Sequence, residues 1–194
     1  MNCFCGALFE KITINKNEYE LCKSCGYLRK ISNLSSKEEK ERYDNHVCDL
    51  GYLEYMEGVY KKIKPHIKGV SLDFGCGKIH ALADLINKDS KCYFYDLYYY
   101  PELPKICFDT IILIEVFEHI KDVYNLMLEL KNMLNENGRI IIMTMVKKYP
   151  LEKWWYLRDS THVSFVDNHT MEVLALKTGL SLSIFDGYFV FDVK

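Results

Sequence analysis

The chain has 194 residues, of which 49% are hydrophobic, and its 25 Lys and Arg residues nearly balance its 27 Asp and Glu residues. A chain of this length can bury its own core, and a formal charge of -2 argues against a general electrostatic attraction to nucleic acid. No stretch approaches the roughly 20 apolar residues of a membrane helix, and the chain does not open on a signal sequence. We therefore expect a cytoplasmic protein with one compact domain and a small appendage.

Four of the eight cysteines lie in the first 25 residues, in two local pairs. Without an export signal, such pairs are more typical of a metal site than of disulfides, and four thiolates are a usual ligand set for structural zinc. Alternating residues around 15–17 predict a hairpin between the pairs, and bound metal would supply folding energy that about 30 residues cannot obtain from burial. Residues 1–31 are thus predicted to form a zinc ribbon, with free thiols or a redox dithiol less favoured. The predicted ligands are Cys3, Cys5, Cys22 and Cys25, and the predicted packing residues are Cys48, Cys76, Cys92 and Cys107.

The rest of the chain is predicted to be a connector followed by an α/β domain. Charged and polar residues dominate the connector, 32–50, which we expect to be a helix or a linker. The α/β domain, 51–194, opens with an amphipathic helix over 51–67. Strands and helices then alternate, with strands over 70–74, 92–96, 108–114 and 139–145, helices over 81–87, 123–134 and 169–177, and closing strands over 180–185 and 188–193.

The sharpest local signal is the segment Leu72–Gly77, which ends an apolar strand and opens a helix. Its two glycines let the backbone turn tightly and approach a ligand. Asp96 closes the next strand, where a carboxylate can hold the hydroxyls of a ribose. The arrangement predicts a nucleoside-binding site. A dinucleotide site would need a third glycine where this sequence has His80, which disfavours an oxidoreductase.

The segment Leu72–Gly77 resembles the first motif of class I S-adenosylmethionine-dependent methyltransferases. Phe108–Ile120 resembles the family's fourth strand and exit loop, and 135–140 resembles the turn before its fifth strand. Residues 154–165 resemble the substrate-side segment of small bacterial methyltransferases with an N-terminal cysteine pair. The resemblance implies a Rossmann-like sheet and S-adenosylmethionine as cofactor. It implies cofactor contacts at Asp73, Phe74, Gly75, Cys76, Gly77, Asp96, Leu97 and Glu115.

Two departures from the family pattern concern the cofactor site. Ile79 replaces the usual third glycine of the loop and could crowd the methionine part of the pocket. The segment between Asp96 and Phe108 is too short for a helix, a strand and another helix, so the third strand is expected to be missing or shortened. Leu97 and tyrosines 98–100 are then candidates to cover the adenine, with loop packing as the alternative.

Glu115, Glu118 and His119 follow a buried strand, at the edge where doubly wound sheets bind ligands. We predict His119 or His162 as the general base that accepts a proton from the methyl acceptor. The spacing E-x-x-E-H also resembles metal-binding loops in small-RNA 2′-O-methyltransferases and ubiquinone-pathway O-methyltransferases. A catalytic divalent ion at Glu115, Glu118 and His119, completed by His162, is the less favoured alternative.

The predicted function is methyl transfer to a small molecule. The aromatic segment Trp154–Tyr156 is a candidate lid over the acceptor, with core packing equally favoured, and Tyr43 and His46 are candidates to reach the same pocket. One alternative is an RNA or protein methyltransferase that docks its substrate on the ribbon, which lysines 61, 62, 64 and 68 near the pocket would favour. The other is a non-catalytic interaction protein that keeps the fold. No partner within a membrane is expected, and the oligomeric state is left open.

Overall fold

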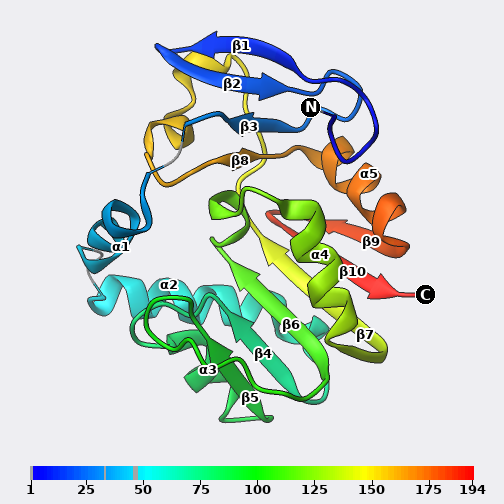
Figure 1. Ribbon diagram of the computed structural model, residues 1–194. Coiled ribbons are helices and arrows are strands. Elements are labelled where there is room, and N and C mark those ends of the chain that lie inside the picture. Colours follow the sequence, from blue (N-terminus) through cyan, green and yellow to red (C-terminus); the bar gives the residue numbers. More distant parts are fainter. Residues whose placement is uncertain (1, 33, 46–47) are drawn as a thin grey trace.

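The computed structural model describes residues 2–32, 34–45 and 48–194, and it contains two sheets (Figure 1). The main sheet has the spatial order β5 (Cys92–Tyr95), β4 (Ser71–Phe74), β6 (Phe108–Ile114), β7 (Leu134–Met143), β10 (Tyr188–Val193) and β9 (Leu180–Phe185). Its first four strands run parallel, whereas β10 is antiparallel to both neighbours. The smaller sheet has the order β1 (Glu10–Ile14), β2 (Asn17–Leu21), β3 (Leu28–Lys30) and β8 (Ser164–Phe165).

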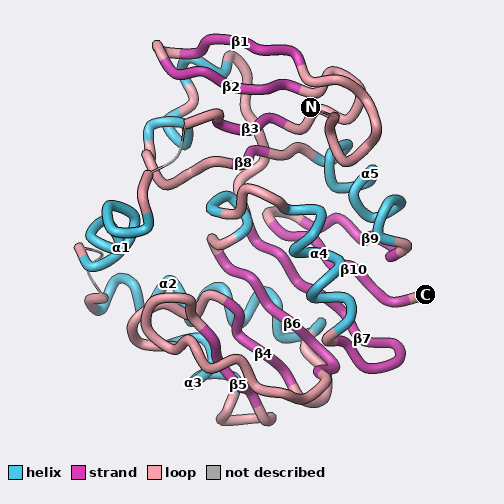
Figure 2. Tube along the Cα trace, viewed as in Figure 1, coloured by secondary structure: helices cyan, strands magenta, loops and turns pink. Residues whose placement is uncertain are grey.

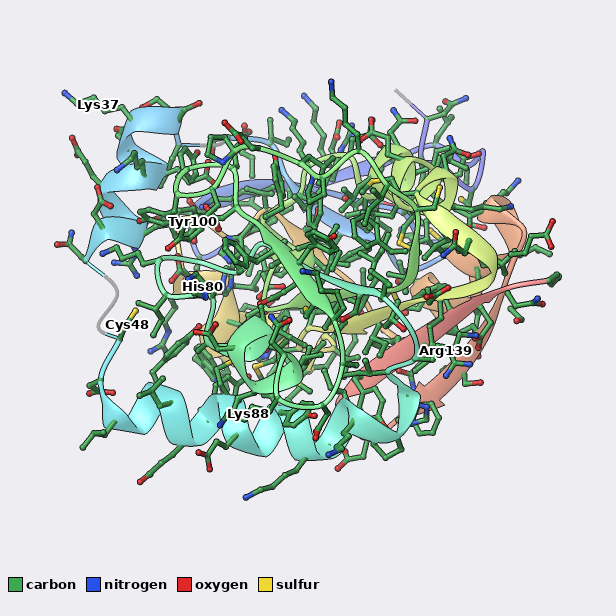
Figure 3. All side chains as sticks on the ribbon, turned by 90° about the horizontal axis from the view of Figure 1, so that it is seen from below. Lys37, Cys48, His80, Lys88, Tyr100 and Arg139 are labelled. Carbon is green, nitrogen blue, oxygen red and sulfur yellow. The ribbon has the colours of Figure 1, made fainter. Side chains whose placement is uncertain are left out.

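Helices cover both faces of the main sheet (Figures 1 and 3). Because strand side chains alternate between faces, Ile112 and Ile114 pack in one core cluster with α2 (Leu50–Ile63) and α3 (Ala81–Ile86). Ile111 and Leu113 pack in the other cluster with α4 (Val123–Asn132) and α5 (Asn168–Thr178). The β6 run is therefore buried on both faces, which is why its sequence is continuously apolar. The predicted α/β Rossmann-like fold is confirmed.

Individual residues mark the ends of two helices and the turn of the hairpin. Asp122 caps α4 by accepting a hydrogen bond from the Asn125 N–H (3.1 Å). Asp167 caps α5, and Gly179 ends that helix with a φ of 69°. The predicted hairpin is β1 and β2, and its turn is carried by residues 15 and 16 in left-handed conformations. Among the described residues, no helix is long and apolar enough to cross a membrane.

Several boundaries differ from the predicted ones. Helix α2 ends at Ile63, and a 3-10 turn, η1 (Lys64–His66), contains Pro65. Strand β7 starts at Leu134 and runs through the expected turn at Asn137, where φ is 62° and the pairing with β6 is irregular. The described segment 96–107 contains no strand, only an isolated bridge, so β5 is an edge strand and the family's third strand is missing as predicted.

The N-terminal ribbon and the connector are joined closely to the main domain. Helix α1 (Ser36–Asp44) forms part of the connector between the two sheets (Figure 2). The ribbon takes its fourth strand, β8, from more than 130 residues further along the chain. Strands β3 and β8 were not predicted, because three and two residues are too few to show a period.

Candidate active site

A cavity of about 710 Å³ lies at the carboxyl ends of β4, β5 and β6. Seven of the eight predicted cofactor-binding residues line it: Asp73, Gly75, Cys76, Gly77, Asp96, Leu97 and Glu115. Phe74 does not. Strand alternation turns its ring to the other face, where it packs against Tyr95 (ring centroids 4.9 Å apart). The Phe74 ring therefore lies outside the cavity, which leaves only its backbone for the predicted cofactor contact.

The glycine turn after β4 is shaped by two positive φ angles. Gly75 has a φ of 82°, and a Cβ there would lie 2.4 Å from a methyl carbon of Val116. Gly77 has a φ of 69°, and no heavy atom lies within 4 Å of the position its Cβ would take. Its N–H donates to Oδ2 of Asp96 (3.0 Å). The turn thus presents bare backbone to the cavity and is tied to the end of β5.

Asp96 also organises the loop that follows β5. Its Oδ1 accepts hydrogen bonds from the backbone N–H groups of Tyr98 (2.9 Å) and Tyr99 (3.1 Å). Leu97, Tyr98 and Tyr99 line the cavity, so they remain candidates to cover an adenine. Tyr100 does not line the cavity, and its hydroxyl donates to the Lys78 carbonyl (2.8 Å).

The two residues where a third glycine was expected turn away from the cavity. Ile79 packs against the α2 core cluster and does not line the cavity, contrary to the expectation that it crowds the pocket. His80 has a φ of 35°, and its ring stacks on Phe94 with centroids 4.3 Å apart. This histidine therefore adopts a backbone conformation that glycine would adopt at lower cost.

Asp73 is the most deeply buried carboxyl group among the predicted cofactor-binding residues. Its exposed fraction is 3%, and burial raises its pKa to about 7, assisted by the negative charges of Asp96 and Asp84. The Ala83 backbone acts in the opposite direction. Asp73 is thus poised between its neutral and charged forms close to neutral pH.

A carboxyl pair bridged by a tyrosine lies at the end of β6. Tyr156 donates to Oε1 of Glu118 and lies 3.2 Å from Oε2 of Glu115, while Thr144 donates to the other oxygen of Glu118 (2.8 Å). Burial, and then the neighbouring Glu118 charge, raise the pKa of Glu115 to about 8. Burial also raises the pKa of Glu118. Sequence reasoning missed Thr144, whose only signal is a polar residue directly after the apolar run that ends β7.

The two predicted catalytic histidines line the cavity side by side. The rings of His119 and His162 have centroids 4.9 Å apart. Nδ1 of His119 lies 3.2 Å from the Thr161 carbonyl, and Nδ1 of His162 lies 2.9 Å from the Tyr156 carbonyl. Because a carbonyl only accepts, each Nδ1 carries the hydrogen and each Nε2 keeps a lone pair. Burial, and then His119, lower the pKa of His162 to about 4, so His162 is neutral at neutral pH.

The candidate catalytic metal site differs from the predicted one. Ligand atoms of Glu118, His119 and His162 lie within 4.8 Å of one another. Glu115 is not in this set; its Oε2 lies 3.2 Å from the Tyr156 hydroxyl instead. The predicted ligand set is therefore corrected to Glu118, His119 and His162.

The aromatic segment 154–157 is divided between the core and the cavity. Trp154 is buried in the cluster under the ribbon, whereas Trp155 is 58% exposed and lines the cavity. Asp159 pairs with Arg42 of α1 (3.1 Å). Tyr43 lines the cavity as predicted, with its ring against His119, while His46 lies outside the described residues.

The lysines that would favour RNA as the substrate do not line the cavity. Lys62 pairs with Asp186 and Lys64 with Asp89, at the far end of α2 from the cavity-lining Tyr52. The observation that would favour RNA is therefore not met by the described residues.

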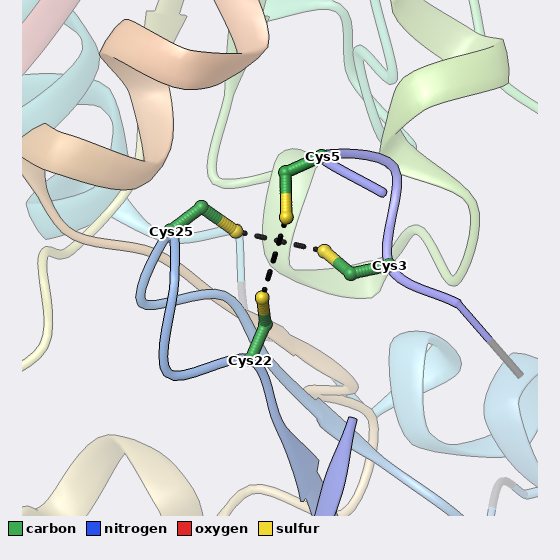
Figure 4. Close-up of side chains that lie close together, drawn as sticks. All are labelled: Cys3, Cys5, Cys22 and Cys25. Atoms are coloured by element: carbon green, nitrogen blue, oxygen red, sulfur yellow. Dashed lines mark hydrogen bonds between the residues drawn. The ribbon is translucent and has the colours of Figure 1, made fainter. Parts of the chain in front are cut away.

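The four N-terminal cysteines converge on one point (Figure 4). Cys3 and Cys25 have sulfurs 3.5 Å apart, and Cys5 and Cys22 have sulfurs 3.4 Å apart. Tetrahedral zinc with four thiolates requires separations of about 3.8 Å, so the donor set fits zinc with a small expansion. Of the other cysteines, Cys76 and Cys92 are buried as predicted, but Cys48 and Cys107 are exposed, so that prediction is wrong for them.

Solved methyltransferase structures share this fold. The 1,6-didemethyltoxoflavin-N1-methyltransferase of Burkholderia thailandensis, bound to 1,6-didemethyltoxoflavin and S-adenosylhomocysteine, has a TM-score of 0.55 at 11% identity, covering 96% of this chain and 98% of that one. A Thermotoga maritima S-adenosylmethionine-dependent methyltransferase, a possible histamine N-methyltransferase, has a TM-score of 0.55 at 12% identity, covering 82% and 96%. The magnesium protoporphyrin IX methyltransferase of Synechocystis PCC 6803 has a TM-score of 0.52 at 11% identity, covering 84% and 93%.

The fold is that of class I S-adenosylmethionine-dependent methyltransferases. A family model described as a methyltransferase domain matches residues 27–183, and the chain belongs to this family. A search of curated proteins gave no significant match.

Proposed function

We propose that this methyltransferase acts on a small molecule held beside His119 and His162. The observation that carries the proposal is that one cavity joins the glycine turn and Asp96 to the two histidines. At about 710 Å³, the cavity is in the range of sites for cofactors and small ligands.

The cofactor side fits S-adenosylmethionine through this chain's own groups. The open space beside Gly77 leaves room for close approach to backbone, and Asp96 stands where it can hold ribose hydroxyls. Bound S-adenosylmethionine supplies a methyl group made electrophilic by its sulfonium. The protein then has to orient the acceptor, exclude water and accept a proton.

We assign proton acceptance to Nε2 of His119. A histidine with a pKa near 4 is a weak base, so His162 is better suited to accept a hydrogen bond from the acceptor than to hold its proton. His119 is also less buried than His162, which opens a route for the proton to solvent. Its Nδ1–H is anchored on the Thr161 carbonyl, which orients Nε2.

The cavity surroundings support a small, uncharged or cationic acceptor. Its described lining includes six Asp and Glu side chains, among which Asp159 has a lowered pKa and stays charged, and a single lysine, Lys78, whose ammonium group is bound to the Asp44 carbonyl. A phosphorylated acceptor would meet repulsion there. Tyr43, Tyr55 and Trp155 offer apolar surface to a planar acceptor.

A second mechanism is favoured by the convergence of Glu118, His119 and His162. Both histidines direct their Nδ1–H to carbonyls, which is the usual support for imidazoles that bind a metal through Nε2. In that arrangement a divalent ion would lower the pKa of an acceptor hydroxyl and replace the histidine base. Titration with Mn²⁺, followed by its electron paramagnetic resonance signal, tests this directly. Loss of tight binding in Glu118→Gln would support the metal, and absence of binding to the wild type would exclude it.

Calorimetric titration with S-adenosylmethionine and S-adenosylhomocysteine tests the proposed function first. Asp96→Ala should lower affinity at least tenfold, whereas Asp186→Ala, which removes an exposed carboxylate away from the cavity, should leave it unchanged. An acceptor screen with the wild type, His119→Gln and His162→Gln then follows. His119→Gln should reduce turnover about 100-fold without changing cofactor affinity. Equal turnover in that variant would exclude His119 as the base.

A further inference from the structure

We propose that the four-cysteine ribbon positions His119 and His162, with Tyr27 and strand β3 as the connection. The ribbon contributes no residue to the described lining of the cavity, which begins at Glu39. Its effect must therefore pass through the segments that carry the histidines. The catalytic part of this inference rests on the proposed function, whereas the positional part does not.

The segment that carries His162 belongs to the ribbon sheet. Strand β3 pairs with β8, with Leu28 opposite Phe165, and the Lys30 N–H donates to the Val163 carbonyl (2.8 Å). Val163 directly follows His162. The backbone position of this histidine is thus set by a strand that leaves the four-cysteine site.

Tyr27 connects the same strand to the turn that carries His119. The Tyr27 side chain is 2% exposed, and its hydroxyl lies 2.7 Å from Oγ of Ser164 and 3.3 Å from the Lys121 carbonyl. Ser164 in turn donates to the Ile120 carbonyl. Two hydroxyl groups therefore hold β8 against the residues that follow His119, and Tyr27 is only two residues beyond the ligand Cys25.

The two histidine segments also bond to each other. The Val163 N–H donates to the Glu118 carbonyl (2.8 Å), and Nδ1 of His119 lies 3.2 Å from the Thr161 carbonyl. A shift of β8 would therefore change the partner that orients the His119 ring. The ribbon controls both rings through one junction.

A third contact comes from the apolar face of the ribbon hairpin. Ile14 and Tyr19 pack in one cluster with Trp154 and Tyr156. The Tyr156 carbonyl is the partner of Nδ1 of His162 (2.9 Å), and its hydroxyl bridges Glu115 and Glu118. Packing of the ribbon thus also holds Tyr156, whose carbonyl orients the His162 ring.

The glycine turn and Asp96 do not depend on the ribbon in this way. Gly75, Gly77 and Asp96 are held by β4, β5 and one another, and Gly77 bonds directly to Asp96. Removal of zinc, or of the Tyr27 hydroxyl, should therefore disturb the histidines and leave cofactor affinity nearly unchanged. Tyr27 is a positioning residue in this scheme, because it acts through β8 and the 118–121 turn.

The test compares ¹⁵N-labelled full-length protein in four forms: zinc-loaded wild type, chelator-treated wild type, Tyr27→Phe and Tyr60→Phe. Tyr60→Phe is the matched control, since it removes a tyrosine hydroxyl bound to Asp89, away from the ribbon. Long-range ¹H–¹⁵N spectra report which ring nitrogen of each histidine carries the hydrogen. Amide exchange at Val163 reports the junction, and calorimetry reports the Kd for S-adenosylhomocysteine.

Zinc-loaded wild type and Tyr60→Phe should show hydrogen on Nδ1 of His119 and His162. Tyr27→Phe should shift both signals and speed Val163 exchange about tenfold, with less than a twofold change in Kd. Chelator treatment should do the same or more; if it unfolds the chain, Tyr27→Phe decides. Unchanged histidine signals and Val163 exchange in Tyr27→Phe would overturn the proposal. Absence of S-adenosylhomocysteine binding to zinc-loaded wild type would instead overturn the proposed function, and the histidine spectra would still decide the positional inference.

Discussion

The proposed cofactor side and the proposed acceptor side of the cavity differ in how far apart their residues lie along the chain. The cofactor side comes from two neighbouring turns, Asp73–Gly77 and Asp96–Tyr99, which are joined by one hydrogen bond from Gly77. The acceptor side is assembled from α1, the β6 exit and the 155–162 segment. The ribbon packs against this second group at Tyr156 and contributes no residue to the described lining.

This difference indicates why we expect the acceptor side to depend on a scaffold more than the cofactor side does. A turn held by its own φ angles and one carboxylate loses little conformational entropy beyond that of the strands it joins. Segments 43 residues apart, such as those carrying His119 and His162, must be brought together by contacts made elsewhere. In this protein those contacts are provided by the ribbon sheet and its cluster with Trp154 and Tyr156.

The largest expected effect comes from disrupting the four-cysteine metal site of the ribbon. Cys22→Ser should remove one of four zinc ligands and lower the free energy of unfolding by at least about 3 kcal/mol, because metal binding contributes directly to folding. Zinc content and thermal unfolding measure this. Cys107→Ser, which changes an exposed cysteine, is the control and should retain zinc and stability. Equal zinc content in both variants would contradict the assignment of the site.

Substitution of Gly75 should disrupt the cofactor side. Gly75→Ala places a Cβ against Val116 in a left-handed conformation, so we expect about 2 kcal/mol lower stability and at least tenfold weaker S-adenosylhomocysteine binding. Gly58→Ala is the matched control, because Gly58 is helical and its Cβ position is open; it should leave binding unchanged and stabilise slightly. Normal binding by Gly75→Ala would show that the turn is not the cofactor site.

The two sides of the cavity also differ in how much of each could be predicted from the sequence. The strands β6, β9 and β10 were predicted to the residue, since long apolar runs and turn signals mark both ends. Seven of the eight predicted cofactor residues line the cavity, and six of them lie in two local turns. Phe74 lies outside the lining, because a motif match does not say which face a strand residue occupies.

On the acceptor side, sequence could name the histidines but not their partners. Val163, Thr161 and Tyr156 orient the rings through backbone groups, which leave no residue-type signal. Strand β8 is two residues long, and its pairing with β3 depends on tertiary contact. The ribbon was therefore predicted as a separate unit, although its sheet is completed by the main domain.

Asp73 offers a test of the cofactor side that depends on pH. Its pKa is raised from 3.8 to about 7 by burial, so between these values the folded chain holds a proton that the unfolded chain has lost. Raising the pH through this window therefore removes stability from the wild type. Asp73→Asn should match the wild type near pH 4 and exceed it by about 2 to 4 kcal/mol at pH 8, measured by urea unfolding. Asp186→Asn, at an exposed carboxylate, is the control and should show no such divergence. A constant difference between Asp73→Asn and the wild type across this range would mean that Asp73 is ionised throughout.

The smallest expected effect concerns α1, which has no buried residue and lies between the two sides. Arg42 bonds to Asp159 (3.1 Å), but its side chain is 52% exposed, so Arg42→Ala should lower the free energy of unfolding by less than about 1 kcal/mol, and less still in 1 M salt. Lys37→Ala is the control, because its partner Glu41 lies within α1 itself. The informative measurement is the Kd for S-adenosylhomocysteine. An unchanged Kd in Arg42→Ala would place α1 with the acceptor side, since Tyr43 faces His119. A Kd raised more than about threefold would mean instead that the bonds of Tyr98 and Tyr99 to Glu39 and Asp44 make α1 part of the cofactor side, and that the two sides share this helix.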